Sequence, residues 1–121
     1  MTDASRLNEH PVAGIDRRNG AAVIHLAGEL DLYNAGEVRA ALLELCAEQP
    51  ERLVVDLGDV EFVDSTALGV LIEARTKLEN RRAFLLAAPG LETHRALTIS
   101  GLDQHLSVHE TVDAALEAKL S

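Results

Sequence analysis

The sequence predicts an α/β fold in which helices pack on a mixed, mostly parallel sheet. Short apolar runs rich in β-branched residues alternate with amphipathic helical stretches, in the order β-β-α-β-α-β-α-β-α. The chain has 121 residues, enough for one core but too few for two domains. Its hydrophobic fraction is 47% with one tyrosine and two phenylalanines, which predicts a folded chain with an aliphatic core. We expect a flexible tail over residues 1–10 and one domain over residues 11–121.

Two antiparallel strands are predicted at the start of the domain. The dipeptide Asn19-Gly20 separates two strand-like runs, residues 12–18 and 21–27. This dipeptide favours the tight type I′ turn of a β-hairpin. The segment at 28–31, Gly-Glu-Leu-Asp, is expected to end the second strand.

The first helix should follow at once. Asn34 and Glu37 stand three residues apart, like the two members of a capping box. Four apolar residues then recur at helical spacing: Ala35, Val38, Leu42 and Leu45. The helix should end near Gln49-Pro50. Cys46 lies within it and is the sole cysteine, so a disulfide framework is excluded and a small core residue is predicted.

The central segment is the most informative part of the chain. A short apolar strand at 53–55 is followed by a polar turn, and the turn delivers Asp64-Ser65-Thr66 to the start of a helix. The apolar stripe of that helix is Ala67, Val70, Leu71, Ala74 and Leu78. We expect Arg81-Arg82 to close the helix, because cations suit the negative end of its dipole.

The rest of the chain alternates strand and helix in the same way. We predict a strand at 83–88, stopped by Pro89-Gly90, a short helix at 91–99, and a brief strand at 105–109. A terminal helix is predicted at 111–120. Its inward residues should be Val112, Ala115, Leu116 and Leu120.

The charge balance limits the class of partner. Twenty acidic and eleven basic residues give a net charge of −9, which argues against nucleic acid as a ligand and mildly favours a basic protein. No apolar run is long enough to span a membrane, and the N-terminal residues lack the apolar centre of a signal peptide. We therefore expect a cytoplasmic protein that binds neither membrane nor nucleic acid.

The sequence gives no indication of an enzyme. The spacing of Asp31, Asp56, Asp59 and Asp64 matches no metal-binding loop, and Asp56 is expected to cap the turn that follows its strand. The five histidines form no metal-binding pair and should be solvated at the surface. No nucleophile elbow, phosphate-binding loop or dinucleotide fingerprint is present. We expect no catalytic residue, no metal and no cofactor.

The candidate functional residues are the hydroxyls of Ser65 and Thr66. A helix N-terminus carries unpaired N–H groups and a positive dipole, which suit a phosphate there. The alternative is that one of the two residues merely caps the helix. Ser65, Gly69, Ile72 and Thr76 share one line away from the apolar stripe, and such a ridge suits the docking of another protein. For Gly69, close packing within the fold is the alternative.

Three motifs in order resemble a known family. Leu26-Ala27-Gly28-Glu29-Leu30-Asp31, followed by Asn34-Ala35, looks like the start of STAS domains of the anti-sigma factor antagonist type. The segment from Val54 to Gly69, which contains Asp64-Ser65-Thr66, looks like the central signature of that family. Ser100-Gly101-Leu102 is similar to its last motif. The resemblance covers roughly residues 12–120 and implies the STAS fold.

The resemblance also implies a function. Such bacterial proteins bind an anti-sigma factor and so release a sigma factor. The anti-sigma factor is usually a serine kinase, which would modify Ser65, with Thr66 as an alternative acceptor, and a phosphatase of the PP2C type would reverse the modification. The implied partner-binding residues are Asp31, Asp64, Ser65, Thr66, Leu68, Gly69 and Ile72. The alternative is a structural STAS subunit of another complex, such as a transport ATPase or a stress-signalling scaffold.

One position departs from the family pattern. Ala67 stands where the family usually has glycine after the hydroxyl pair. Alanine favours a regular helix at this point. The change bears on how closely a kinase can approach the backbone beside Ser65.

Overall fold

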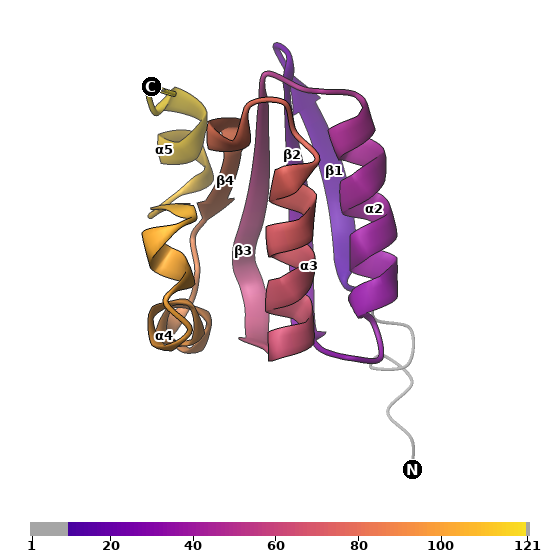
Figure 1. The fold of residues 1–121 in the computed structure, drawn as a ribbon, viewed down its shortest axis with the longest axis vertical. Helices are drawn as coiled ribbons and strands as arrows, with labels where there is room; N and C mark the ends of the chain where they lie inside the picture. The colour runs from indigo at the N-terminus through magenta and orange to yellow at the C-terminus, as the bar shows by residue number, and fades with distance from the viewer. Residues whose placement is uncertain (1–9, 121) are drawn as a thin grey trace.

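The sheet has five strands in the order β1-β2-β3-β4-β5. The computed structural model describes residues 10–120, so most of the predicted tail at 1–10 lies outside the described residues. β1 pairs with β2 in antiparallel register, and every other neighbouring pair is parallel (Figure 1). The predicted mixed, mostly parallel sheet and the predicted order of elements are confirmed.

The strands and helices have the following bounds. The strands are β1 (Val12–Arg18), β2 (Ala21–Leu30), β3 (Arg52–Val63), β4 (Phe84–Ala87) and β5 (Ser107–His109). The helices are α2 (Ala35–Ala47), α3 (Ser65–Thr76), α4 (Leu91–Ile99) and α5 (Val112–Glu117). There are also two short 3₁₀ turns. η1 (Arg81–Ala83) lies between α3 and β4, and η2 (Leu102–Gln104) lies between α4 and β5.

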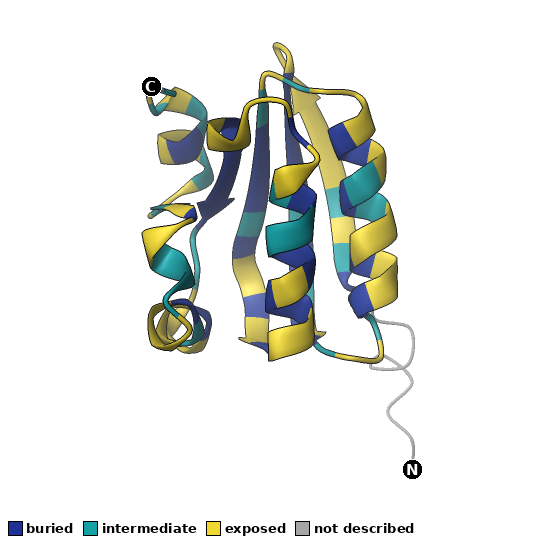
Figure 2. Ribbon diagram, viewed as in Figure 1, coloured by how far each residue is buried: buried dark blue, intermediate teal, exposed yellow. Residues whose placement is uncertain are grey.

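Helices cover the two faces of the sheet unequally. α2 and α3 lie side by side on one face (Figure 1), and the large core forms between them and the strands. The predicted stripe of α3 is buried there at all five positions, and Cys46 of α2 is buried as well. α5 covers part of the opposite face, where Ala115 packs with a smaller cluster: Val23, Val54, Leu85 and Ala87. Figure 2 shows β4 and most of β2 as buried, whereas β1 at the edge of the sheet is largely exposed.

The two central strands are longer than predicted. Gly28 does not break β2, which continues past the predicted end at 27, because parallel pairing with β3 persists as far as Leu30 and Val63. Two register shifts interrupt that pairing, and Gly28 adopts a left-handed φ of 78° beside one of them. The segment predicted as a polar turn therefore belongs largely to β3, and Ser65 follows β3 after a single residue.

Several predicted element ends were also wrong. α2 begins after Asn34 as predicted, but the Asn34 side chain makes no cap hydrogen bond, because it bonds the Asp31 N–H and the Glu29 carbonyl instead. Arg81 and Arg82 do not close α3, which ends at Thr76; both lie in η1. The last strand starts at Ser107, after His105, and α5 is shorter than predicted.

Among residues 10–120, no helix combines the length and apolar character needed to cross a membrane.

Candidate functional site

The site forms where the carboxyl ends of β2 and β3 meet the first turn of α3. Asp64 is the N-cap residue of α3, and its Oδ1 atom accepts a hydrogen bond of 2.9 Å from the Ala67 N–H. The same carboxylate accepts a 3.1 Å bond through Oδ2 from the Leu32 N–H in the β2–α2 loop. One side chain therefore fixes both the helix start and the neighbouring loop.

This geometry excludes one of the two interpretations of the hydroxyl pair. Because Asp64 caps α3, the expectation that Ser65 or Thr66 serves as the cap is wrong. Both residues are exposed in the first turn of α3, and neither hydroxyl has a hydrogen-bond partner among residues 10–120. The two hydroxyls are thus accessible at the positive end of the helix dipole.

The β2–α2 loop holds Asp31 next to this site. The Asp31 carboxylate accepts a 3.0 Å bond from the Tyr33 N–H, and the Asp31 N–H donates to Asn34 Oδ1 at 2.9 Å. Asp31 therefore shapes the turn of this loop. Through the bond between Leu32 and Asp64, the loop that carries Asp31 lies beside the start of α3.

The predicted ridge along α3 is only partly a surface feature. Leu68 is 7% exposed and belongs to the core, so the expectation that it contacts a partner is not supported. Ile72 is half-buried and packs against the core, although it was expected to point away from it. Gly69 is exposed, and a Cβ built there meets no atom within 4 Å, which excludes close packing as the reason for glycine.

Ala67 faces inward. It is 3% exposed and belongs to the large core. The methyl group that replaces the usual glycine hydrogen therefore does not project onto the surface beside Ser65.

Exposed apolar side chains around the site escaped the sequence analysis. Leu32 is 68% exposed, Tyr33 is 95% exposed and Phe62 is 48% exposed. Leu32 and Tyr33 lie in the loop that Asp64 holds, and Phe62 precedes Asp64 by two residues. The exposure of Leu32 and Tyr33 could have been predicted from the sequence. Both are apolar residues inside a turn, where no periodicity predicts burial.

A second polar cluster lies away from α3, on the sheet. His25 Nδ1 lies 2.6 Å from Asp56 Oδ2, and His25 Nε2 lies 2.8 Å from Asp16 Oδ2. Hydrogen bonds to Asp16 and Asp56 raise the pKa of His25 above its ordinary value of 6.5. His25 is therefore not the solvated surface histidine that was expected. The Asp56 Oδ1 atom also accepts a 2.9 Å bond from the Gly58 N–H. Both residues lie inside β3, so the prediction that Asp56 caps a turn after its strand is wrong.

The residues that could ligate a metal are scattered. Within residues 10–120, no group of three or more histidine, cysteine, aspartate or glutamate side chains is placed to hold a metal ion. The site at α3 consists of a carboxylate, two hydroxyls and apolar side chains. These groups offer hydrogen bonds and apolar contacts to another molecule.

The fold and the site together define a small protein-binding module that presents a serine at the start of a helix. The sequence pattern of the STAS domain matches residues 13–115. The chain belongs to the STAS domain family.

Curated relatives in this family include regulators of transcription. The chain is 36% identical over 98 residues to the anti-sigma-F factor antagonist RsfB of Mycobacterium tuberculosis. The alignment covers 81% of this chain and 80% of that protein. It is 34% identical over 87 residues to the anti-sigma-B factor antagonist of Listeria monocytogenes, with 70% and 75% of the two chains covered.

Solved structures share the fold. An anti-sigma factor antagonist from Mycobacterium paratuberculosis superposes with a TM-score of 0.79 at 32% identity, over 84% of this chain and 87% of that chain. The unphosphorylated form of SpoIIAA superposes with a TM-score of 0.72 at 20% identity, over 86% and 92% of the two chains, which is a likeness of fold alone.

Proposed function

We propose that this protein is an anti-sigma factor antagonist, and that phosphorylation of Ser65 controls its binding. The observation that carries the proposal is the exposed Ser65 hydroxyl in the first turn of α3. Because Asp64 caps the helix, this hydroxyl has no capping role. The names of the curated relatives support the same function. The protein is a binding switch and not an enzyme.

The partner surface consists of Ser65, Thr66 and Gly69 together with the exposed Leu32, Tyr33 and Phe62. We call these residues the docking face. Exposed aromatic and aliphatic side chains beside polar groups are typical of protein interfaces. Asp31, Asp59 and Glu61 add negative charge at the same end of the sheet, which suits a partner with a basic rim.

Phosphorylation would act on this face through charge. A phosphoryl group adds about −1.5 to −2 charges and is stabilised at a helix N-terminus, so α3 tolerates it. In a desolvated interface the same charge is costly unless the partner supplies a cation. The free protein therefore keeps its fold, and the complex dissociates.

The partner would be an anti-sigma factor with serine kinase activity, and a PP2C-type phosphatase would restore the unmodified state. The corresponding location of this protein would be the bacterial cytoplasm. A structural role in a transport or stress complex is not favoured, because the curated relatives above are antagonists.

The test is phosphorylation by the anti-sigma factor itself. An anti-sigma factor captured on the immobilised protein is incubated with wild type, Ser65→Ala and Thr66→Ala in the presence of ATP. Intact-mass spectrometry should show a gain of about 80 Da, the mass of one phosphoryl group, in wild type and Thr66→Ala only. A gain in Ser65→Ala would reassign the acceptor, and capture of no anti-sigma factor would contradict the proposed function.

A further inference from the structure

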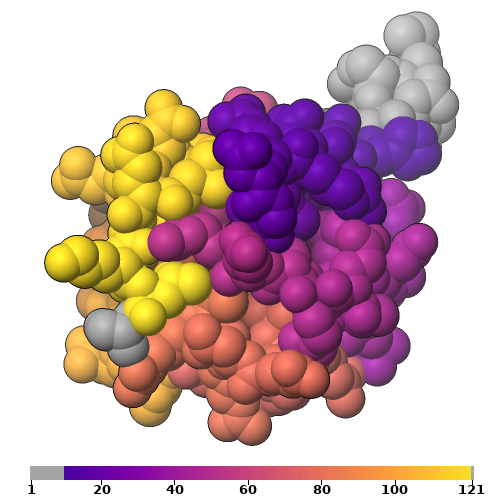
Figure 3. All heavy atoms as spheres, turned by 90° about the horizontal axis from the view of Figure 1, so that it is seen from above, coloured from indigo at the N-terminus to yellow at the C-terminus, as the bar shows by residue number. Residues whose placement is uncertain are grey.

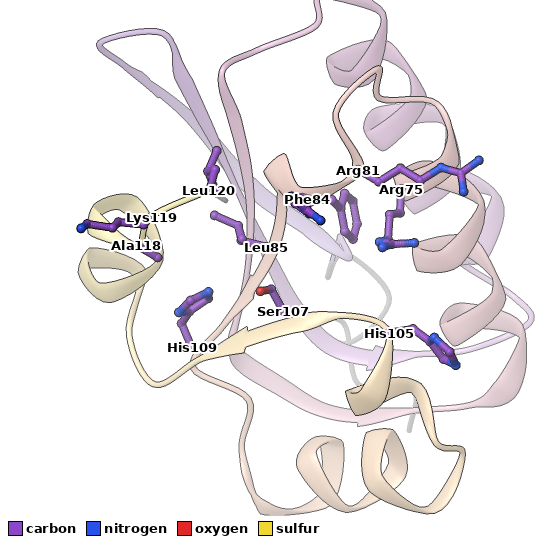
Figure 4. Close-up of a pocket in the computed structure, with 11 residues that line it drawn as sticks. Arg75, Arg81, Phe84, Leu85, His105, Ser107, His109, Ala118, Lys119 and Leu120 are labelled. Atoms are coloured by element: carbon purple, nitrogen blue, oxygen red, sulfur yellow. The ribbon is translucent and has the colours of Figure 1, made fainter.

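A cavity of about 250 Å³ lies at the opposite end of the molecule from the docking face (Figure 4). Its walls come from the end of α3, the turn η1, the strand β5 and the segment after α5. Figure 3 looks onto this end and shows the α3–β4 connection and the C-terminal residues meeting on one surface. α3 rises about 1.5 Å per residue, so Arg75 at the cavity and Ser65 lie roughly 15 Å apart along its axis.

The lining of this cavity is cationic. Arg75, Arg81, Arg82 and Lys119 all line it, and none of the aspartates and glutamates between residues 10 and 120 does. The chain as a whole carries a net charge of −9. The lining of this cavity is therefore positively charged although the chain as a whole is acidic.

The arginines of the cavity also differ from the others in their partners. Among residues 10–120, each arginine side chain outside the cavity is paired: Arg17 with Glu48, Arg18 with Asp16, Arg39 with Glu73, Arg95 with Glu92, and Arg52 with the Ala115 carbonyl. In the same described part of the chain, the side chains of Arg75, Arg81 and Arg82 have no hydrogen-bond or ion-pair partner. The unpaired arginines and the cavity arginines are the same three residues.

β5 adds two polar groups to the lining. Ser107 offers a hydroxyl, and His109 lines the cavity with its Nε2 atom buried and without a hydrogen-bond partner. Figure 4 shows Arg75 and Arg81 on one side of the cavity and His109 on the other, with Ser107 between them. A buried nitrogen without a partner is unfavourable, so a ligand oxygen that reached it would gain free energy.

We propose that this cavity binds a small molecule that carries phosphoryl groups. Guanidinium groups donate paired hydrogen bonds that match the oxygens of a phosphate, and three of them with one ammonium balance a multiply charged anion. The volume is below that of most ligand pockets, so the molecule is small. The site is separate from the docking face and does not depend on the proposed function.

Isothermal titration calorimetry with inorganic pyrophosphate tests the proposal. The wild-type protein should bind one equivalent, and Arg75→Gln/Arg81→Gln should bind at least tenfold more weakly. The control Arg17→Gln/Arg95→Gln removes the same two charges at paired surface positions and should change the affinity by less than twofold. An equal loss in both double variants would show a general charge effect and overturn the proposal, as would the absence of binding at millimolar pyrophosphate.

Amide chemical shifts locate the ligand. Addition of pyrophosphate should shift the resonances of Ser107 and His109 and leave those of Ser65 and Thr66 unchanged. Citrate at the same concentration should shift them far less, because its carboxylates are spaced differently from linked phosphoryl groups. Shifts confined to the start of α3, or an equal response to citrate, would overturn the assignment of a phosphoryl site here.

Discussion

The Asp64 carboxylate accepts a 3.1 Å hydrogen bond from the backbone N–H of Leu32, across 32 residues of sequence. The bond joins the β2–α2 loop to the start of α3, and the other oxygen of the same carboxylate caps that helix. The Asp64 side chain thus helps to fix the position of the exposed Leu32 and Tyr33 relative to Ser65.

Asp64→Ala should disturb stability and the docking face together. Loss of the cap and of the bond to Leu32 should lower the free energy of unfolding by about 1–2 kcal/mol, as measured by urea denaturation. Thr111→Ala is a matched control, because Thr111 caps α5 far from the site and its loss should cost about 1 kcal/mol. Anti-sigma factor binding should weaken for Asp64→Ala alone; equal binding by the two variants would contradict the role of Asp64 in the docking face.

Ser65→Asp should separate folding from binding. A carboxylate in the first turn of α3 should leave the melting temperature unchanged or raise it slightly, since the helix dipole contributes a few tenths of a kcal/mol. The anti-sigma factor should bind Ser65→Asp at least tenfold more weakly than Ser65→Ala in surface plasmon resonance. Thr66→Asp places the same charge one residue later. If it weakened binding as much, a switch specific to Ser65 would be excluded.

Gly69→Ala should have opposite effects on stability and on binding. A Cβ at this position meets no atom within 4 Å, so the helix should gain about 0.5–1 kcal/mol from the better propensity of alanine. If the partner backbone packs against Gly69, the same methyl group should weaken the complex. A thermal melt and a binding titration on the same sample check both effects. Unchanged binding would remove Gly69 from the docking face.

Tyr33→Ser tests the apolar part of the docking face without touching the core. Tyr33 is 95% exposed, so the free energy of unfolding should change by no more than about 0.5 kcal/mol. Anti-sigma factor affinity should fall by more than about fivefold, since exposed tyrosines often contribute strongly to interfaces. Ile99→Ser removes another exposed apolar side chain, 79% exposed on α4, and should leave the affinity unchanged. Ile72→Glu is a poorer probe, because Ile72 packs against the core.

His25 should make stability depend on pH. Asp16, which Arg18 also approaches at 3.9 Å, and Asp56 both bond the imidazole and raise its pKa above 6.5. A raised pKa in the folded state stabilises the protein fully below pH 6.5, and that contribution declines as the pH rises through the raised value. Urea denaturation between pH 6 and pH 9 should show this decline in wild type and less of it in His25→Gln. An identical slope in both proteins would contradict the role of His25.

The sequence predicted the fold well where one local pattern decides the structure. The stripe from Ala67 to Leu78 has a helical period and is buried at each position, and Asn19-Gly20 joins β1 and β2 as expected. Prediction was wrong where tertiary pairing decides. The end of β2 depends on its register with β3, and the capping role of Asn34 was lost to hydrogen bonds within the loop.

The candidate site shows the same division. The position of Ser65 at a helix start follows from local sequence, and the structure confirms that position. The bond between Asp64 and Leu32 could not be predicted, because it joins residues that only the parallel pairing of β2 and β3 brings together. Leu68 and Ile72 were predicted at the partner surface for a different reason. A helical stripe gives the centre of a buried face but not its width, so the burial of these two side chains was missed.

The two outer strands of the sheet limit how the molecule can associate. A strand at a sheet edge offers unpaired N–H and C=O groups to any other chain. β5 has only three residues, and β1 carries Asp16, Arg17 and Arg18 along its exposed length. Short or charged edges resist the addition of another strand. The two edges therefore favour association through helices and loops over extension of the sheet.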